Sequence, residues 1–491
     1  MRSIKNKKFP IGRFSKVITK ALALLLVAVI CVGCQQQVAE EVAEQTTELL
    51  TEALELQRIN DVAISEYAII YSEDTNDYNT RAARHIRDHI KDLTGLTIEV
   101  IPDYMPASYE HEIVVGETNR DISKQLDADT ENMQFAIMAD GNSIALEGDY
   151  FIIAAAAYFF VETYLPDTYF NTTVPQGVSV HEPIQKQTKN YIIMIGDGMG
   201  FNQTLLFEKY ANKMSSMTPY SDGEDLFYGY YFPAQGESRT NSKSGVTDSA
   251  AGGTALSSGY KTKNGYVGKD SSGINVKSLT ELASSLGKAT AVMSTDSNTG
   301  ATPAAFSAHA IDRSDSATIK ASQEAGAKEY GTIISCGENP YDKTGVTSLM
   351  NTLKFTLNHL SKDSDGFFMM YEEAHIDKWS HKNYMEDTFK AVARFNQAIG
   401  VVMEYVFYNP ETFVLITADH ETGGLVYGLD GSFKYTKTDH SGANVPVFAY
   451  GANAELFNGL AIENTQIPKT IAAMMGVTDF GAKDNYTSLL Q

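Results

Sequence analysis

The second half of the chain alternates short apolar runs with long helical patterns. The apolar runs predict strands at Tyr191–Ile195, Thr290–Ser294, Thr332–Cys336, Phe367–Tyr371, Thr412–Thr417 and Pro446–Tyr450. The predicted helices include Thr347–Leu360, Tyr384–Tyr408 and Pro468–Met475. Apolar strands that alternate with helices are typical of a parallel sheet covered on both faces. Residues 190–491 are therefore predicted to form a three-layer α/β/α sandwich with a mainly parallel sheet.

Residues 61–185 predict a separate small α/β domain. Strands are expected at Val62–Ile70, Thr97–Ile101 and Glu112–Gly116, helices at Arg81–Leu93 and Ile152–Tyr164, and a hairpin at Phe135–Glu147. The helix, the strand and the run Val115–Arg120 resemble the small α/β domain that precedes the catalytic domain in several glycoside hydrolases. That domain is an accessory in those enzymes, so the resemblance implies no chemistry here. A polar linker follows at residues 183–189.

The first 33 residues predict an export signal. Six basic residues between Lys5 and Lys20 precede the apolar stretch Ala21–Val32, which is shorter than the ~20 residues needed to span a bilayer. The run Cys31-Val32-Gly33-Cys34 resembles the end of a bacterial lipoprotein signal peptide, with Cys34 as the lipidated first residue of the mature chain. An uncleaved anchor helix is the alternative. Both interpretations hold the exported protein at a bacterial membrane, with residues 34–60 as an acidic tether.

The net charge and the cysteine content limit which partners and which metal ligands the chain can have. Removal of residues 1–33 changes the formal net charge from −22 to −29, which argues against nucleic acid as a docking partner. An anionic substrate remains compatible, because metal ions can supply a local positive site. Of the three cysteines, Cys336 is the one that export leaves as a free thiol. Any metal site must therefore be built from histidines and carboxylates.

Candidate chemistry lies where the predicted strands end, which is where α/β sheets place ligand sites. The carboxylates and histidines that follow strands or precede the last one are Asp197, Asp377, His381, Asp419, His420 and His440. The four-residue spacing of Asp377 and His381 puts both on one face of a helical turn. Histidine and carboxylate ligands without cysteine suit a catalytic zinc site. Each residue alone could equally be a helix cap, a surface pair or a loop turn, so it is their shared order that favours a site.

The run Val246–Ala255 places Ser249 where a loop turns into a helix. Free N–H groups and the positive end of the helix dipole suit an anionic electrophile such as a phosphoryl group. A serine hydroxyl needs activation, and the spacing suggests no serine–histidine pair, so a metal is expected to stabilise the alkoxide. A plain helix start with a serine N-cap is the alternative.

The order of these motifs resembles that of the alkaline phosphatase family over residues 190–480. The matching runs are Asp-Gly-Met-Gly from Asp197, Thr-Asp-Ser-Ala-Ala from Thr247, Ala-Thr-Pro-Ala-Ala from Ala301 with a downstream arginine, Glu372 with Ile376-Asp377 and His381, Thr-Ala-Asp-His from Thr417, and a final histidine, His440. The resemblance implies that Ser249 is the nucleophile and forms a phosphoserine. It also implies that Arg313 clamps phosphate oxygens, with Lys378 as a further basic residue on the phosphate side.

The same resemblance implies two zinc ions and one magnesium ion. One zinc would be held by Asp377, His381 and His440, and the other by Asp197, Asp419 and His420, with Ser249 as its substrate-side ligand. The magnesium ion would take Asp197, Thr302 and Glu372. Gly300 departs from the family pattern, because members commonly carry Asp or His there to shape the magnesium shell. The expected magnesium site is therefore weaker, differently hydrated or filled by another ion.

Two further departures are Glu373 and His375, which stand where the family usually has small residues. We expect His375 to face solvent and His309 to be a packed helix residue. Substrate specificity is expected in the loops Ala211–Glu237 and Val426–Thr438, whose sequences name no substrate. Association into a homodimer is left open.

The predicted function is metal-dependent hydrolysis of small-molecule phosphate monoesters at alkaline pH, with release of inorganic phosphate. A phosphodiesterase or sulfatase of the same superfamily is the nearest alternative. Ser249, Arg313 and Glu372 favour the monoesterase, and no sulfatase motif surrounds Ser249. A carbohydrate-binding or scaffold lipoprotein, with residues 62–185 as its functional domain, is an alternative from a different class. A complete set of metal ligands argues against it, because such a protein does not need one.

Overall fold

The computed structural model describes residues 57–490 except 74–76, 107–108, 127–132, 142, 168, 215–225 and 337–342. The predicted signal peptide, Cys34 and most of the acidic tether lie outside the described residues. None of the helices in the described ranges combines the length and apolarity that a bilayer crossing requires. The boundary between two compact units of the chain falls between Glu182 and Pro183.

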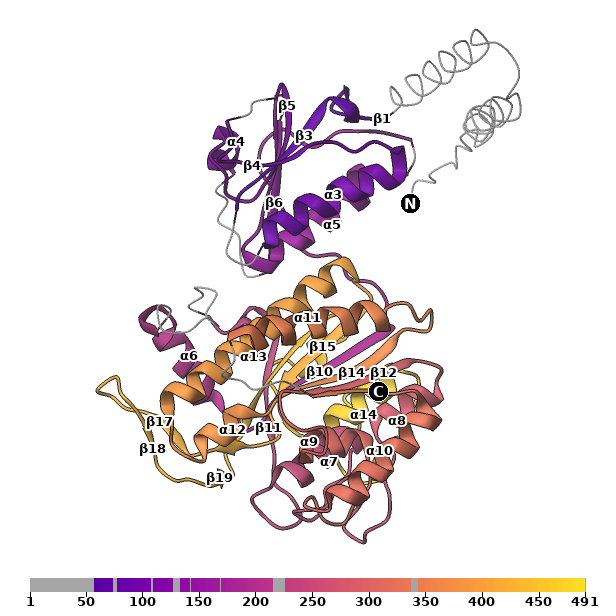
Figure 1. Cartoon of the computed structure of the whole chain (residues 1–491), viewed down its shortest axis with the longest axis vertical. Helices are drawn as coiled ribbons and strands as arrows, with labels where there is room; N and C mark the ends of the chain where they lie inside the picture. The colour runs from indigo at the N-terminus through magenta and orange to yellow at the C-terminus, as the bar shows by residue number, and fades with distance from the viewer. Residues whose placement is uncertain are drawn as a thin grey trace. The chain divides into compact units, whose positions relative to one another are not determined.

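The smaller unit has a six-stranded sheet in the order β4-β3-β5-β7-β6-β9 (Figure 1). Its strands are β3 (Tyr67–Tyr71), β4 (Val100–Pro102), β5 (His111–Val115), β6 (Phe135–Asp140), β7 (Ser143–Glu147) and β9 (Ser179–His181). Helices α3 (Tyr78–Thr94) and α5 (Ile153–Tyr164) pack on it, and α4 (Asp121–Gln125) is a short helix. The predicted hairpin is confirmed, because β6 and β7 pair antiparallel.

The predicted strand Val62–Ile70 is wrong as a single element. A 3-10 turn at Ile64–Glu66 separates β2 (Val62–Ala63) from β3, and β2 pairs instead with β1 (Gln57–Ile59), which also pairs with β8 (Phe170–Thr172). The run Val115–Arg120 starts with the last residue of β5 and continues as a bend, with Gly116 at φ +78°. The Arg120 guanidinium donates through Nε to Glu112 Oε2 at 2.9 Å. This contact joins the end of the run to β5, so the motif has a structural role.

The larger unit has an eight-stranded sheet in the order β13-β12-β14-β10-β15-β20-β11-β21. Its strands are β10 (Asn190–Gly196), β11 (Ala234–Arg239), β12 (Ala289–Ser294), β13 (Ile333–Cys336), β14 (Phe367–Glu373), β15 (Thr412–Thr417), β20 (Val445–Tyr450) and β21 (Ala461–Glu463). β20 runs antiparallel to both of its neighbours, whereas the other neighbouring strands pair in parallel. The prediction of a mainly parallel sheet is confirmed.

Helices cover both faces of this sheet, as a three-layer sandwich requires. Figure 1 shows α11 (Lys343–Leu360) and α13 (Met385–Tyr408) on one face. The other face carries α7 (Ser249–Ser258), α8 (Leu279–Ser285), α9 (Ala301–Ser307), α10 (Ser316–Tyr330) and α14 (Gln466–Met474). Two further helices are α6 (Phe201–Met214) and α12 (His375–Ser380). Beyond the sheet, β16 (Glu421–Thr422) pairs with β19 (His440–Ser441), and β17 (Leu425–Tyr427) with β18 (Phe433–Tyr435).

β11 was missed by the sequence pattern. Its residues, Ala-Gln-Gly-Glu-Ser-Arg, lack an apolar run, and the prediction placed Ala234–Glu237 at the end of a specificity loop. The structure instead inserts this segment between β20 and β21, so that part of the loop assignment is wrong. Residues 215–225 of the same predicted loop lie outside the described residues.

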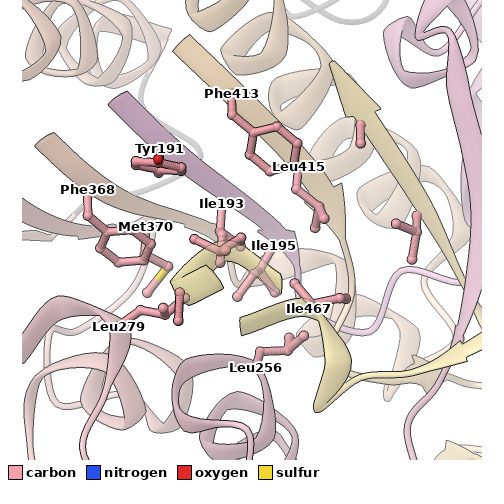
Figure 2. Close-up of a cluster of buried hydrophobic side chains, with 14 of the residues drawn as sticks. Tyr191, Ile193, Ile195, Leu256, Leu279, Phe368, Met370, Phe413, Leu415 and Ile467 are labelled. Carbon is pink, nitrogen blue, oxygen red and sulfur yellow. The ribbon is translucent and has the colours of Figure 1, made fainter. Parts of the chain in front are cut away.

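One large part of the core of the larger unit lies between the central strands and the helices on one face. Figure 2 shows Ile193 and Ile195 of β10 beside Phe368 and Met370 of β14, with Leu256 of α7, Leu279 of α8 and Ile467 of α14 around them. All seven side chains are fully buried. Burial of each such side chain stabilises the fold by about 1.5–3 kcal/mol. The core thus fixes the strands whose carboxyl ends bear the candidate chemistry.

Candidate active site

Strand register brings the predicted acidic residues to one edge of the sheet. β10 lies between β14 and β15, with Ile195 paired to Glu372 on one side and to Thr417 on the other. Asp197 follows β10 directly, and Asp419 follows β15 after one residue. Asp197, Glu372 and Asp419 are buried, with exposed fractions of 7%, 2% and 0%. Three strands far apart in sequence therefore deliver three carboxylates to the same interior place.

One histidine–carboxylate group consists of Asp377, His381 and His440, whose ligand atoms lie within 4.8 Å of one another. Asp377 Oδ1 is 3.3 Å from His381 Nε2 and 3.5 Å from His440 Nε2. The helix α12 supplies the i, i+4 pair that the sequence predicted, and β19 supplies His440. This is the first predicted zinc set, brought together from segments about sixty residues apart.

The hydrogen bonds around these two histidines fix their tautomers. His381 Nδ1 lies 2.5 Å from Thr438 O, and His440 Nδ1 lies 2.8 Å from Thr247 O. A carbonyl oxygen can only accept, so each Nδ1 bears a proton, which leaves Nε2 of each ring as the nitrogen whose lone pair can bind a metal. The two Nε2 atoms are 3.1 Å apart. Two lone pairs this close repel each other unless a cation or a proton lies between them, which suits a metal site.

A second group consists of Asp197, Asp377 and His420, again with ligand atoms within 4.8 Å. Asp419, which the sequence assigned to this set, is also close, with Oδ2 3.3 Å from His420 Nε2. Asp419 Oδ1 accepts backbone N–H bonds from Gly198 at 3.3 Å and His420 at 3.0 Å. Among the described residues, Asp197 Oδ1 and Asp419 Oδ2 are buried oxygens without a hydrogen bond. Unpaired buried carboxylate oxygens are costly unless a cation compensates them.

The electrostatics of the cluster point the same way. Burial, followed by the charges of Asp419, Asp377 and Glu372, raises the pKa of Asp197 well above its ordinary value. Burial, with Asp419 adding to it, raises the pKa of Glu372 to about 8. Burial also acts to raise the pKa of Asp377, but hydrogen bonds and charges from the surrounding histidines and Thr422 outweigh it and lower the pKa. Bound cations would relieve the repulsion that keeps protons on Asp197 and Glu372.

The predicted magnesium set, Asp197, Thr302 and Glu372, is also brought together. Thr302 lies buried in the first turn of α9, and its Oγ1 has no hydrogen-bond partner among the described residues. Glu372 Oε2 accepts a hydrogen bond from Ser294. Gly300 caps this helix in a tight turn, where an added Cβ would lie 2.9 Å from Ser297 O. The turn therefore leaves no room for the acid or histidine of the family pattern at this position.

Lys378 makes an ion pair that the sequence did not predict. Its Nζ lies 2.5 Å from Asp296 Oδ2, in the segment after β12. Burial opposes the ionised form of Asp296, but Lys378 outweighs it and lowers the pKa of Asp296. The predicted phosphate-side lysine is thus held by a carboxylate four residues before Gly300.

Ser249 begins helix α7, and Asp248 is its N-cap. Asp248 Oδ1 accepts a hydrogen bond from Ala251 N at 3.0 Å. Ser249 Oγ lies 3.2 Å from His420 Nε2, a serine–histidine contact that the spacing did not suggest because 171 residues separate the two. His420 Nε2 also faces Asp197 and Asp419. The hydroxyl therefore points at the second ligand group, as the metal-assisted mechanism needs.

Arg313 reaches the same helix start. Its NH1 donates to Asp248 Oδ2 at 3.1 Å, and its side chain is 39% exposed. The planar fork keeps other N–H groups available for an oxyanion beside Ser249. The sequence placed Arg313 near the site only by resemblance, and the contact with Asp248 supplies the physical reason.

Two expectations about polar neighbours are wrong or incomplete. His375 was expected to face solvent, but it is 8% exposed and its Nδ1 lies 3.2 Å from Thr295 Oγ1. Glu373 is fully buried and pairs with Arg394 of α13, a residue that sequence reasoning missed. Twenty-one residues and a helix turn separate the partners, so no local pattern reveals the pair. His309 is partly buried as expected, but it follows α9 rather than lying within it.

Comparisons with known proteins agree with the sequence motifs. The family described as alkaline phosphatase matches residues 188–335 and 338–435. Alkaline phosphatase 3 of Bacillus subtilis (strain 168) is 29% identical over 304 residues, 51% of this chain and 65% of that protein. Alkaline phosphatase of Escherichia coli (strain K12) is 23% identical over 411 residues, 60% of this chain and 87% of that protein. The match thus spans just under two thirds of the length of the Bacillus relative.

A solved structure gives the same picture of the fold. The alkaline phosphatase from the Antarctic bacterium TAB5 is 26% identical to this chain, with a TM-score of 0.51. The alignment covers 59% of this chain and 99% of that one. The remaining part of this chain is long enough to include the smaller unit, and the family match lies within the larger unit.

Proposed function

Because the chain belongs to the alkaline phosphatase family, we propose that it hydrolyses phosphate monoesters at alkaline pH through a phosphoserine formed on Ser249. The observation that supports this most directly is the convergence of Ser249 Oγ and His420 Nε2, 3.2 Å apart, beside the unpaired carboxylate oxygens of Asp197 and Asp419. A nucleophile next to such a donor set fits metal-assisted attack on a phosphoryl group.

We propose that the chain's donor groups hold three cations. Asp377, His381 and His440 would hold one zinc ion; Asp197, Asp419 and His420 would hold a second; and Asp197, Thr302 and Glu372 would hold a magnesium ion. When bound, these ions act as Lewis acids and lower the pKa of a coordinated hydroxyl or water. Thr438 and Thr247 carbonyls keep His381 and His440 in the tautomer that ligation needs.

In the proposed reaction the chain's own groups orient the phosphoryl group and transfer it from the substrate oxygen to Ser249. Arg313 binds two phosphate oxygens through its fork, while Asp248 holds the guanidinium beside Ser249. Ser249 Oγ gives its proton to solvent and bonds to phosphorus as the ester oxygen leaves with its bonding electrons and takes a proton from solvent. Water then attacks phosphorus, a proton of that water passes to Ser249 Oγ as this oxygen leaves with its bonding electrons, and inorganic phosphate is released. Lys378, paired with Asp296, adds positive charge on the phosphate side.

We infer from residues 1–34 that the chain is exported and anchored through a lipid on Cys34, at the extracytoplasmic face of a bacterial membrane. The acidic composition argues against nucleic acid as a docking partner, and a small anionic substrate stays compatible because bound metal ions would supply local positive charge.

A chromogenic phosphate monoester, assayed at alkaline pH beside the matching diester, tests the function. Activity on the monoester should disappear with a chelator, return with zinc, and be lost in Ser249→Ala. Ser257→Ala, on the same helix, is the matched control and should remain active. Chelator-insensitive hydrolysis would contradict the metal assignment, and preference for the diester would move the function to a phosphodiesterase.

A further inference from the structure

Arg313 lies at the end of a short backbone ladder. Val267 N donates to Ala310 O at 2.8 Å, Ala310 N donates back to Val267 O at 2.9 Å, and Arg313 N donates to Gly265 O at 2.8 Å. Gly265 N in turn donates to Asp248 Oδ2 at 2.9 Å, the same oxygen that accepts from Arg313. The position of the guanidinium therefore depends on how the segment 265–268 lies against 310–313.

His309 fixes the base of this ladder. Its Nδ1 lies 2.6 Å from Gly268 O, and its Nε2 lies 2.9 Å from Glu281 Oε1. A carbonyl oxygen can only accept, so Nδ1 bears a proton and donates to Gly268 O, and the Glu281 carboxylate beside Nε2 favours a second proton on the ring. Burial favours the neutral ring, but Glu281 outweighs it and raises the pKa of His309. The charge of Lys269 opposes the positive form of the ring.

The backbone is shaped to admit this ring. Gly268 has φ +59°, and an added Cβ would lie 2.2 Å from Ala308 O and 2.7 Å from His309 Nδ1. His309 N also donates to Ser322 Oγ of α10 at 3.1 Å. Glu281 is itself fixed, because its Oε2 accepts from Ser278 N at 2.7 Å in the capping box of α8. The His309 ring thus links the ladder to the start of α8.

We infer that His309 is a positioning residue for Arg313: its donation to Gly268 O holds the ladder in the register that aims the guanidinium at phosphate. This inference rests on the proposed function. Among the described residues, His309 hydrogen-bonds to Gly268, Glu281 and Ser322, none of which belongs to the proposed metal-ligand groups. Its loss should therefore weaken phosphate binding through Arg313 and leave the metal content unchanged.

The inhibition constant of inorganic phosphate, a competitive inhibitor of monoester hydrolysis, measures how well Arg313 binds phosphate and so tests the role of His309. Arg313→Ala should raise the inhibition constant of phosphate about 10–100-fold, because it removes a charge-assisted hydrogen bond to the phosphate. His309→Gln can still reach Glu281 but no longer donates at the Nδ1 position, and we expect about a tenfold rise. His309→Asn keeps a donor at the Nδ1 position and should stay within about threefold of the wild type. The pocket of about 270 Å³ that borders His309 and Glu281 leaves room for either side chain.

The decisive measurement is the phosphate inhibition constant of the double variant His309→Gln/Arg313→Ala. If His309 acts through Arg313, His309→Gln adds nothing to the inhibition constant of Arg313→Ala, and the zinc content and kcat of His309→Gln stay near wild type. Independent, multiplying effects would overturn the inference, as would a His309→Asn variant as weak as His309→Gln. Calorimetric binding of inorganic phosphate to the zinc-loaded chain repeats the comparison without turnover. A wild-type chain that binds phosphate but hydrolyses no ester would refute the proposed function and not this inference.

Discussion

Arg394→Met should destabilise the larger unit strongly, because it leaves the Glu373 carboxylate buried without its cation. Glu373 is fully buried, and its Oε2 accepts from Arg394 Nε at 2.6 Å while Oε1 accepts from the other end of the same guanidinium. Thr295 Oγ1 and His375 N donate to Oε1 at 3.0 Å each. Removal of one partner of such a buried pair costs about 3–5 kcal/mol.

The pKa of Glu373 gives a second route to the same magnitude. Burial acts to raise the pKa, but the charges and hydrogen bonds of Arg394 and His375 outweigh it and lower the pKa from 4.5 to about 2. At ~1.4 kcal/mol for each pKa unit, this difference corresponds to about 3 kcal/mol. Because the folded-state pKa is lowered, the stabilisation is present above pH 4.5 and is lost as the pH falls toward 2.

Scanning calorimetry of the full chain at pH 7 measures the effect. A loss of ~3–5 kcal/mol should lower the Tm of the larger unit by about 6–15 °C. Lys390→Met is the matched control on the same helix, since it breaks the exposed pair with Glu386 at 2.6 Å, worth less than ~1 kcal/mol. The deficit of Arg394→Met should shrink as the pH falls from 7 to 4, because the stranded carboxyl is then protonated. Equal effects of the two methionine variants, or a deficit independent of pH, would refute the argument.

Three further outcomes follow from the same geometry. Arg313→Ala should raise the KM for a phosphate monoester about 10–100-fold by loss of charge-assisted hydrogen bonds, and steady-state kinetics that show an unchanged KM would remove Arg313 from the phosphate clamp. Gly300→Asp should lower stability by about 1–3 kcal/mol, because its Cβ would lie 2.9 Å from Ser297 O; a thermal melt equal to wild type would show that the turn can relax. Cys34→Ser should release the chain from the membrane fraction of a bacterial host, and an unchanged distribution would favour the uncleaved anchor helix.

The apolar strands could be predicted because burial on both faces leaves a continuous hydrophobic run. β10 and β15 are buried throughout, and their predicted bounds differ from the observed ones by at most one residue at either end. The order of the parallel strands then places Asp197 and Asp419 at one edge whatever the exact loop conformations. The i, i+4 pair of Asp377 and His381 needed no more than a single helical turn.

What could not be predicted depends on contacts between distant segments of polar sequence. β11 is held by its neighbours and not by its own apolar content. The Glu373–Arg394 pair, the Asp296–Lys378 pair and the bridge from His309 to Glu281 join side chains that share no local pattern. In each case the sequence shows two charged residues whose usual place is the surface, and only the packed structure reveals that they are partners.

Ser249 is expected to become covalently phosphorylated during turnover. The direct measurement is rapid acid quenching of the zinc-loaded chain during hydrolysis of a phosphate monoester, followed by peptide mass spectrometry. One phosphoryl group is expected on the peptide that spans Val246–Ala255, located on Ser249 and absent from Ser249→Ala and from chelated protein. Steady hydrolysis with no phosphorylated residue on that peptide, or with the phosphoryl group on another side chain, would contradict it.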